Sequence, residues 1–185
     1  MQSIIYFAYG SNLLRERLLA RCPSLSFASR AVLAGHQLAF DKASIDKSGK
    51  CAFVRAEGEN VLGVLWDVPN EDLGELDKHE GVGNGYEQCI VSVAREDGNT
   101  VEAVTYRATK HQQGLQPFDW YLALVVAGAV QQQLGQEYID HLRATSFHID
   151  VDATRKTRHE ALGALAMANM MHVFDALAGG NTQAL

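Results

Sequence analysis

The N-terminal hydrophobic pattern predicts a strand, a tight turn and the start of a helix. Residues 4–9 form a compact run of β-branched and aromatic types, which is typical of a buried strand. Gly10, Ser11 and Asn12 follow, and these residue types favour turns and helix N-termini. Leucines at helical spacing come next, and Pro23 ends the predicted helix.

The following part of the chain is predicted to be mostly strand. We expect one or two strands over residues 27–40 and a polar loop over residues 41–50. Two further strands are predicted over residues 52–56 and 61–68, because a Glu-Gly-Glu-Asn segment with turn character separates them.

A short helix and a hairpin come next. Pro69 and Asn70 begin the predicted helix, which ends near Gly81. Polar and apolar residues then alternate over residues 86–95. An Asp-Gly pair connects this strand to a returning strand over residues 101–106, and such a pair is a strong hairpin signal.

The C-terminal part of the chain is predicted to be helical. A largely apolar, buried helix is expected over residues 118–134, and a second helix over residues 136–144. After an irregular segment, one long helix with an unusually wide apolar face is predicted over residues 158–177. That face is explained by packing on its own domain or by contact with a second subunit.

Composition and charge narrow the possible functions. Hydrophobic residues make up 47% of the 185 residues and charged residues 21%, which is ordinary for a globular domain. The net charge of -6 argues against a nucleic-acid binder and against a protein that needs basic contacts to anionic lipid. Three cysteines without a CxxC pair indicate reduced thiols and no zinc site, and two of them, Cys51 and Cys89, fall in predicted strands and are expected in the core. Since no apolar run is long enough for a signal sequence or a membrane span, we expect a cytoplasmic protein.

The first segment with candidate chemistry is Tyr9-Gly10-Ser11-Asn12. Backbone N–H groups at a helix N-terminus bind carboxylates and phosphates, and glycine lets a ligand approach the backbone. A plain turn with Asn12 as a helix cap explains the same residues. The segment lacks the lysine of a phosphate-binding P-loop, and Ser11 lacks the GxSxG context of a nucleophile.

The second segment with candidate chemistry runs from Asp77 to Tyr86, where the predicted helix ends among three glycines. Glu80 lies at the negative end of the helix dipole, and a carboxyl group there that is shielded from water suits general acid and base chemistry. A solvated helix end explains the same residues. His79 precedes Glu80, but neighbouring side chains on a helix point apart, so no metal site is expected.

Taken together, three blocks of the chain resemble the gamma-glutamylcyclotransferase family. Residues 6–14 (YFAYGSNLL) resemble its N-terminal signature. Residues 63–82 (GVLWDVPNEDLGELDKHEGV) resemble a second block, in which the glutamate before Gly-Val is catalytic. A third match runs from residue 117 through Tyr121 to residue 142. The family has a tyrosine shortly after the catalytic glutamate, and Tyr86 arrives one residue early for that position.

This resemblance implies a fold, a reaction and a set of site residues. The implied fold is α+β, with a small mixed β-barrel flanked by helices over residues 1–145. Residues 146–185 lie outside the resemblance, and from their hydrophobic pattern we expect a C-terminal helical extension that packs on this domain or on the partner subunit of a homodimer. The implied reaction converts a γ-glutamyl amino acid or γ-glutamyl amine to 5-oxoproline and a free amine by intramolecular aminolysis, in glutathione metabolism, without a metal or organic cofactor. Glu80 is the implied acid and base, and the implied substrate-binding residues are Tyr9, Gly10, Ser11, Asn12, Leu13, Tyr86 and Tyr121.

Two other classes of function stay open at the level of sequence. A γ-glutamyl hydrolase or acyltransferase acting on a specialised metabolite would use the same pocket with water or another amine as the nucleophile. A non-catalytic module would only bind a small molecule such as 5-oxoproline. Free glutamate as the product would indicate the hydrolase, and tight binding of 5-oxoproline without turnover would indicate the binding module.

Overall fold

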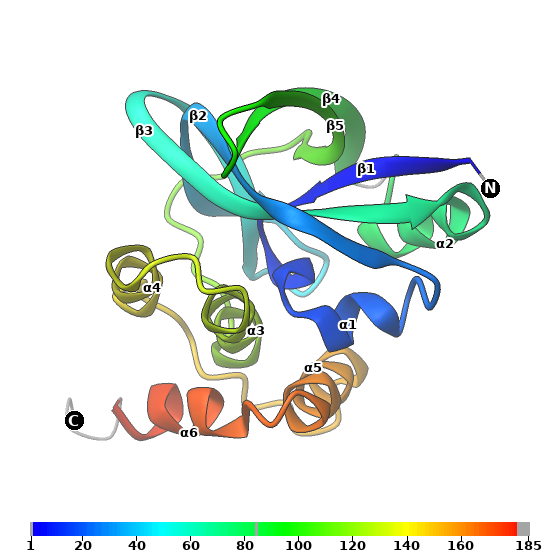
Figure 1. The fold of residues 1–185 in the computed structure, drawn as a ribbon. Helices are drawn as coiled ribbons and strands as arrows, with labels where there is room; N and C mark the ends of the chain where they lie inside the picture. Colours follow the sequence, from blue (N-terminus) through cyan, green and yellow to red (C-terminus); the bar gives the residue numbers. More distant parts are fainter. Residues whose placement is uncertain (1, 84, 181–185) are drawn as a thin grey trace.

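The computed structural model describes residues 2–83 and 85–180, and it shows an α+β fold built on a closed β-barrel (Figure 1). The strands run in the order β1-β3-β2-β4-β5 around the barrel, and a parallel pairing of β1 with β5 closes it. All other pairings are antiparallel, so the predicted small mixed barrel is confirmed. The strands are β1 (Ser3–Ala8), β2 (Ser26–Ala43), β3 (Gly49–Pro69), β4 (Tyr86–Arg95) and β5 (Thr100–Ala108).

The helices gather mainly on one side of the barrel, with α3 among them as the central helix (Figure 1). It contacts the short helix η1 and also α4, α5 and α6. None of the helices in the described part of the chain is long and apolar enough to cross a membrane. The helices are η1 (Ser11–Leu13), α1 (Arg15–Leu19), α2 (Asn70–Glu80), α3 (Asp119–Gln131), α4 (Gln136–Arg143), α5 (Lys156–Met167) and α6 (Met171–Gly180).

The predicted burial of α3 is confirmed, because every residue from Asp119 to Ala129 is buried. A helix that is apolar on all sides must be covered on all sides. Here η1, α4, α5 and α6 pack around α3, and Tyr121 of α3 contacts Cys51 of β3. Its polar first turn is satisfied as well. Asp119 Oδ1 accepts hydrogen bonds from the backbone N–H groups of Trp120 and Asp150.

The expected division of residues 52–56 and 61–68 into two strands is wrong, because both belong to the single strand β3. The turn-like segment between them produces an irregularity inside the β2–β3 hairpin and does not end the strand. Ala34 pairs with Asn60 and His36 with Arg55, so residues 56–59 lie opposite Gly35 alone. Gly35 and Gly58 both have positive φ angles, which glycine adopts at little cost.

Two expected helices are also interrupted. The single helix predicted over residues 158–177 is two helices, α5 and α6, because Asn169 adopts a left-handed conformation with φ of 57° between them. The helix predicted after Asn12 is a single 3-10 turn followed by α1, since Leu14 is extended with ψ of 113°. In both places apolar residues at helical spacing continue across the break, so periodicity alone does not reveal it.

Candidate active site

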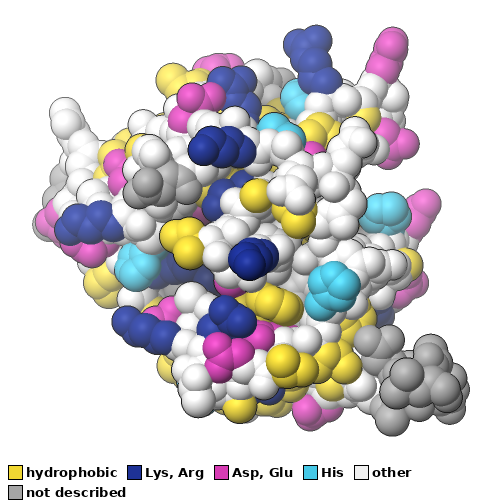
Figure 2. Space-filling model, turned by 180° about the vertical axis from the view of Figure 1, so that it is seen from behind, with side chains coloured by type: hydrophobic (Ala, Val, Ile, Leu, Met, Phe, Trp, Pro, Cys, Tyr) yellow, Lys and Arg dark blue, Asp and Glu magenta, His cyan; other side chains and the backbone are white. Residues whose placement is uncertain are grey.

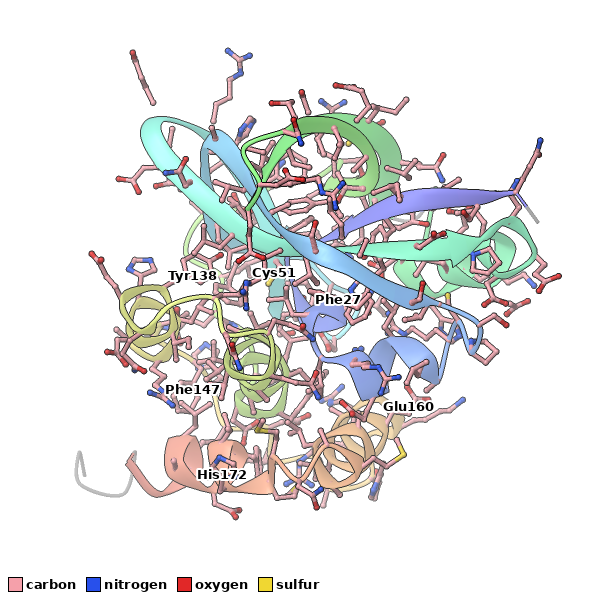
Figure 3. The ribbon with its side chains drawn as sticks, viewed as in Figure 1. Phe27, Cys51, Tyr138, Phe147, Glu160 and His172 are labelled. Atoms are coloured by element: carbon pink, nitrogen blue, oxygen red, sulfur yellow. The ribbon has the colours of Figure 1, made fainter. Side chains whose placement is uncertain are left out.

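A small, partly open cavity lies where the end of β1, η1, the end of α2, β3 and α3 meet. Figure 3 labels Cys51, which lies in the interior between the barrel strands and the helices. The cavity brings together segments that are far apart in the sequence. Its lining residues are Tyr6, Tyr9, Gly10, Ser11, Asn12, Cys51, Glu80, Tyr86, Tyr106 and Tyr121.

Glu80 is the carboxylate of this cavity, and Asn12 and Arg21 hold it in place. It is the last residue of α2, and Gly81 turns the chain there with φ of 69° in the left-handed region. Oε1 of Glu80 accepts hydrogen bonds from Nδ2 of Asn12 at 2.7 Å and from Nη1 of Arg21 at 2.9 Å. The same Nη1 also donates to Oδ1 of Asn12 at 2.9 Å. The guanidinium of Arg21 therefore compensates the charge of a carboxylate whose side chain is only 16% exposed.

The polar network continues from Asn12 to a buried tyrosine. Nδ2 of Asn12 donates to the hydroxyl of Tyr6 at 3.0 Å. Burial raises the pKa of Tyr6 well above its ordinary value, and the negative charge of Glu80 raises it further. Because Tyr6 stays protonated, its hydroxyl is a hydrogen-bond donor at neutral pH. A second tyrosine, Tyr106, donates to Oδ1 of Asp77 at 2.7 Å and so ties α2 to β5.

Tyr86 and Tyr121 line the cavity, but their hydroxyls bond to the backbone of Cys51. The hydroxyl of Tyr86 donates to the Cys51 carbonyl at 2.7 Å, and the Cys51 N–H donates to the hydroxyl of Tyr121 at 3.1 Å. These two tyrosines therefore fix β3 and offer ring surface to a ligand. The hydroxyl of Tyr9 is engaged in the same way by the Tyr106 carbonyl. Burial raises the pKa of the Cys51 thiol to about 12, so this thiol is a weak nucleophile.

The turn after β1 reaches the cavity with Gly10, Ser11 and Asn12, but Leu13 lies outside it. The side chain of Leu13 is fully buried, and its N–H bonds to the Gly10 carbonyl at 2.9 Å. A Cβ atom on Gly10 would lie 3.0 Å from Cβ of Cys51, so glycine allows this close approach of the turn to β3. The N–H groups of Ser11 and Asn12 belong to the first turn of a helix and have no partner within it.

A larger open groove of about 710 Å³ adjoins the cavity. Ser11, Glu80, Tyr86 and Tyr121 line both the cavity and the groove, so Glu80 stands at the junction between them. The remainder of the groove wall comes from α1, the β2–β3 turn, α2 and the start of α5. Within residues 2–83 and 85–180, no cluster of three or more His, Cys, Asp or Glu side chains has the arrangement of a metal site.

Sequence reasoning missed four residues of this site, namely Tyr6, Arg21, Cys51 and Tyr106. Tyr6 opens the first family-like block, so its position there is a signal that could have found it. Arg21 and Tyr106 lie outside all three blocks. Arg21 follows α1 in the chain and reaches Glu80 at the end of α2, and the pairing of β5 with β1 places Tyr106 beside Tyr6.

Comparison with known protein sequences identifies relatives of this chain. The model of the AIG2-like family matches residues 60–142, a range that includes Glu80, Tyr86 and Tyr121. The human gamma-glutamylcyclotransferase is 34% identical over 149 residues, which span 77% of this chain and 79% of the human protein. The bovine gamma-glutamylcyclotransferase is 34% identical over 143 residues, which span 74% of this chain and 76% of the bovine protein.

The structural comparison extends the likeness to most of the fold. A solved structure of a gamma-glutamyl cyclotransferase superposes with a TM-score of 0.79 at 29% identity, covering 88% of this chain and 99% of that one. The likeness therefore includes the barrel and most of the helices around it. Since sequence and fold each agree over more than two thirds of the chain, the chain belongs to the gamma-glutamylcyclotransferase family of enzymes.

Proposed function

We propose that this protein converts a γ-glutamyl compound to 5-oxoproline and a free amine, with Glu80 as the general acid and base. The observation that carries this proposal is the position of Glu80 at the junction between a small cavity and an open groove. The γ-glutamyl unit would lie on the cavity side of Glu80, and the amine that leaves would extend into the groove. The bond that breaks then lies beside the carboxylate.

The proposed reaction is an attack by the α-amino group of the substrate on its own side-chain amide carbonyl. The nitrogen–carbon bond of the five-membered ring forms, the bond to the leaving nitrogen breaks, and one proton moves from the attacking nitrogen to the leaving nitrogen. Both hydrogen bonds from the protein to Glu80 go to Oε1, and Oε2 accepts none from the described residues. Oε2 is therefore the oxygen that takes the proton and returns it. Such acid–base assistance contributes about 10²–10⁴ in rate.

The residues around Glu80 supply the remaining polar contacts that the substrate requires. The N–H groups of Ser11 and Asn12 suit the substrate carboxylate or the oxyanion that develops during attack. The hydroxyl of Tyr6 accepts a hydrogen bond from Asn12 and donates to none of the described residues, so it keeps a donor for a substrate oxygen. Holding the flexible γ-glutamyl chain in a ring-forming shape lowers the entropic part of the barrier.

Replacement of Glu80 by glutamine tests this role. We expect Glu80→Gln to lower the rate of 5-oxoproline formation by at least about 10²-fold, because an amide does not accept the proton. The variant should keep its fold, since the amide oxygen of glutamine can still accept the hydrogen bonds from Asn12 and Arg21. The measurement is turnover of γ-glutamyl-alanine, with thermal unfolding to check the fold.

Glu75→Gln is the matched control for this experiment. Glu75 lies on the same helix but is exposed, and its carboxylate pairs only with Lys78, at 2.6 Å. This change should leave turnover near the wild-type rate. Activity of Glu80→Gln above about a tenth of wild type, in a folded protein, would contradict the proposed role of Glu80.

A further inference from the structure

The groove outside the cavity is strongly cationic, although the whole chain carries a net charge of -6. Figure 2 shows the molecule from behind relative to Figure 1, and Lys and Arg side chains gather around the middle of that face. Among the described residues, the groove wall has two acidic side chains, Asp46 and Glu80. Its basic residues are Arg17, Arg21, Lys42, Lys50, Lys78, Arg155 and Lys156.

Most of these cations already have a carboxylate partner. Arg21 pairs with Glu80 at 2.9 Å, and Lys50 pairs with Asp46 at 3.0 Å. Lys78, Arg155 and Lys156 also have acidic partners. Within the described residues, Arg17 and Lys42 are the groove cations that have no carboxylate within ion-pair distance. Two positive charges at the groove are therefore without a counter-ion from the protein.

Lys42 is the more informative of the two because it is buried. Lys42 is 8% exposed. Its ammonium lies 4.7 Å from the ring centre of Tyr86, which lines the cavity. Gly85 leaves room for this side chain, since a Cβ atom there would lie 2.9 Å from Cε of Lys42. Burial lowers the pKa of Lys42, although Asp46 and Glu80 lie near enough to oppose that effect. A buried ammonium without a partner is costly, and an anionic ligand removes that cost.

Arg17 places the second charge at the turn that lines the cavity. Its Nε donates to the hydroxyl of Ser11 at 3.2 Å, and Ser11 belongs to both the cavity and the groove. Burial and the neighbouring Arg21 lower the pKa of Arg17 to about 9, so it is still cationic at neutral pH. The planar guanidinium suits recognition of a carboxylate.

We infer that the leaving group of the substrate is an amine bearing two carboxylates, such as an acidic amino acid, which Lys42 and Arg17 bind in the groove. This inference rests on the proposed function, because the covalent link to a γ-glutamyl unit in the cavity is what places the leaving group there. Arg17 extends from α1 and Lys42 from β2, so the two charges come from different walls of the groove.

A matched pair of substrates tests the inference. γ-Glutamyl-glutamate and γ-glutamyl-glutamine have nearly the same shape and differ by one carboxylate, and γ-glutamyl-butylamine has no carboxylate on its leaving group. We expect kcat/KM to fall in that order, with about a tenfold step between the first two, equivalent to about 1.4 kcal/mol. Raising the salt concentration from about 0.05 to about 0.5 M should reduce this step, because salt screens the groove charges.

The variant Lys42→Met tests the residue, because methionine keeps an apolar stem against Tyr86 and removes the charge. The preference for γ-glutamyl-glutamate over γ-glutamyl-glutamine should fall to about threefold or less. Lys110→Met is the control, since Lys110 is an exposed lysine outside the groove, and it should keep the full preference. Thermal unfolding of both variants checks that they fold.

The possible outcomes separate this inference from the proposed function. If all three substrates yield 5-oxoproline at similar kcat/KM, the inference is overturned and the proposed function stands. An equal preference in Lys42→Met and wild type would also overturn it. If none of the three substrates yields 5-oxoproline, the proposed function fails, and the inference fails with it.

Discussion

At the scale of single residues, Lys50 shows how strongly this groove perturbs a charge. Its ammonium donates to Asp46 at 3.0 Å and to the hydroxyl of Ser48 at 2.7 Å, and it lies 4.6 Å from the ring centres of Trp120 and Tyr121. Burial nevertheless lowers the pKa of Lys50 from 10.5 to about 8. The cost of removing the ammonium from water therefore exceeds what its partners return.

This lowered pKa predicts a pH-dependent contribution to stability. Between pH 8 and 10.5 the unfolded chain binds a proton at Lys50 that the folded chain has lost, so the free energy of unfolding rises with pH over this window. The free energy of unfolding of wild type, taken relative to that of Lys50→Met, should therefore rise by about 1–2 kcal/mol between about pH 7 and pH 10. Urea unfolding of both proteins at several pH values in this range gives the difference between their free energies of unfolding. Because the two proteins share all other titratable groups, the contributions of those groups cancel in this difference.

Lys47→Met is the control for this measurement. Lys47 lies in the neighbouring turn and is exposed, so Lys47→Met shows what the loss of a lysine charge from this part of the chain does to stability when burial plays no part. A wild-type advantage over Lys50→Met that stays constant or shrinks from pH 7 to pH 10 would contradict the lowered pKa of Lys50.

The residues of the candidate site were predictable only where a local motif contains them. Glu80 and the Gly10-Ser11-Asn12 turn belong to family-like blocks, and the structure brings them into one cavity. Arg21 was not predictable, because its contact with Glu80 joins residues 59 positions apart. Leu13 belongs to the same block as Asn12, yet it lies in the core, since the 3-10 turn directs neighbouring side chains to different sides.

At the scale of elements, the contact between α3 and η1 holds the turn of the candidate site in place. A Cβ atom on Gly128 of α3 would lie 2.5 Å from Cβ of Leu13 and 2.6 Å from the backbone nitrogen of Leu14. The two helices therefore approach at backbone distance. Since Leu13 directly follows Asn12, a shift of α3 would move the residue that holds Glu80.

Gly128→Ala should therefore destabilise the protein by about 1–3 kcal/mol, although alanine favours helices. It should also lower turnover, because η1 must move to make room for the added methyl group. Gly163→Ala in α5 is the control, since nothing lies within 4 Å of a Cβ atom there. That variant should be as stable as wild type or slightly more stable. Thermal unfolding compares the variants, and a Gly128→Ala protein at least as stable as wild type would disprove the close contact.

The secondary structure was predictable where local chemistry decides it. An Asp-Gly pair predicts the hairpin of β4 and β5, and an apolar run predicts the buried α3. Gly81, which adopts a left-handed conformation, marks the end of α2. Prediction failed at residues 57–60 and at Asn169. At residues 57–60, the chain pairs with β2 on both sides of the turn-like segment, so the strand continues. At Asn169, a left-handed conformation divides an otherwise continuous helical pattern.

At the scale of the whole molecule, the barrel was not predictable from periodicity. Its closure depends on the parallel pairing of Tyr6 in β1 with Val104 in β5, near the two ends of the barrel sequence. Alternation along one strand carries no information about which strand lies beside it. The family resemblance, and not the hydrophobic pattern, supplied this part of the expectation.

The C-terminal helices connect the whole molecule to the candidate site. α5 contacts α1 and α3, and α6 contacts α3 (Figure 1). At the start of α5, Arg155 pairs with Asp150, which also accepts a hydrogen bond from Nε1 of Trp120 at 2.8 Å. These contacts set the position of the outer wall of the groove. We propose that residues 146–185 are an extension that completes the groove around the domain of residues 1–145.

The central claim is that the attacking nucleophile is the substrate's own amine, and turnover in ¹⁸O-labelled water tests it most directly. With γ-glutamyl-alanine as substrate, the account predicts 5-oxoproline without ¹⁸O and an equal amount of alanine, because no water enters the product. Mass spectrometry of the products decides the question. Glutamate carrying one ¹⁸O atom as the main product would contradict the account and would identify the protein as a γ-glutamyl hydrolase.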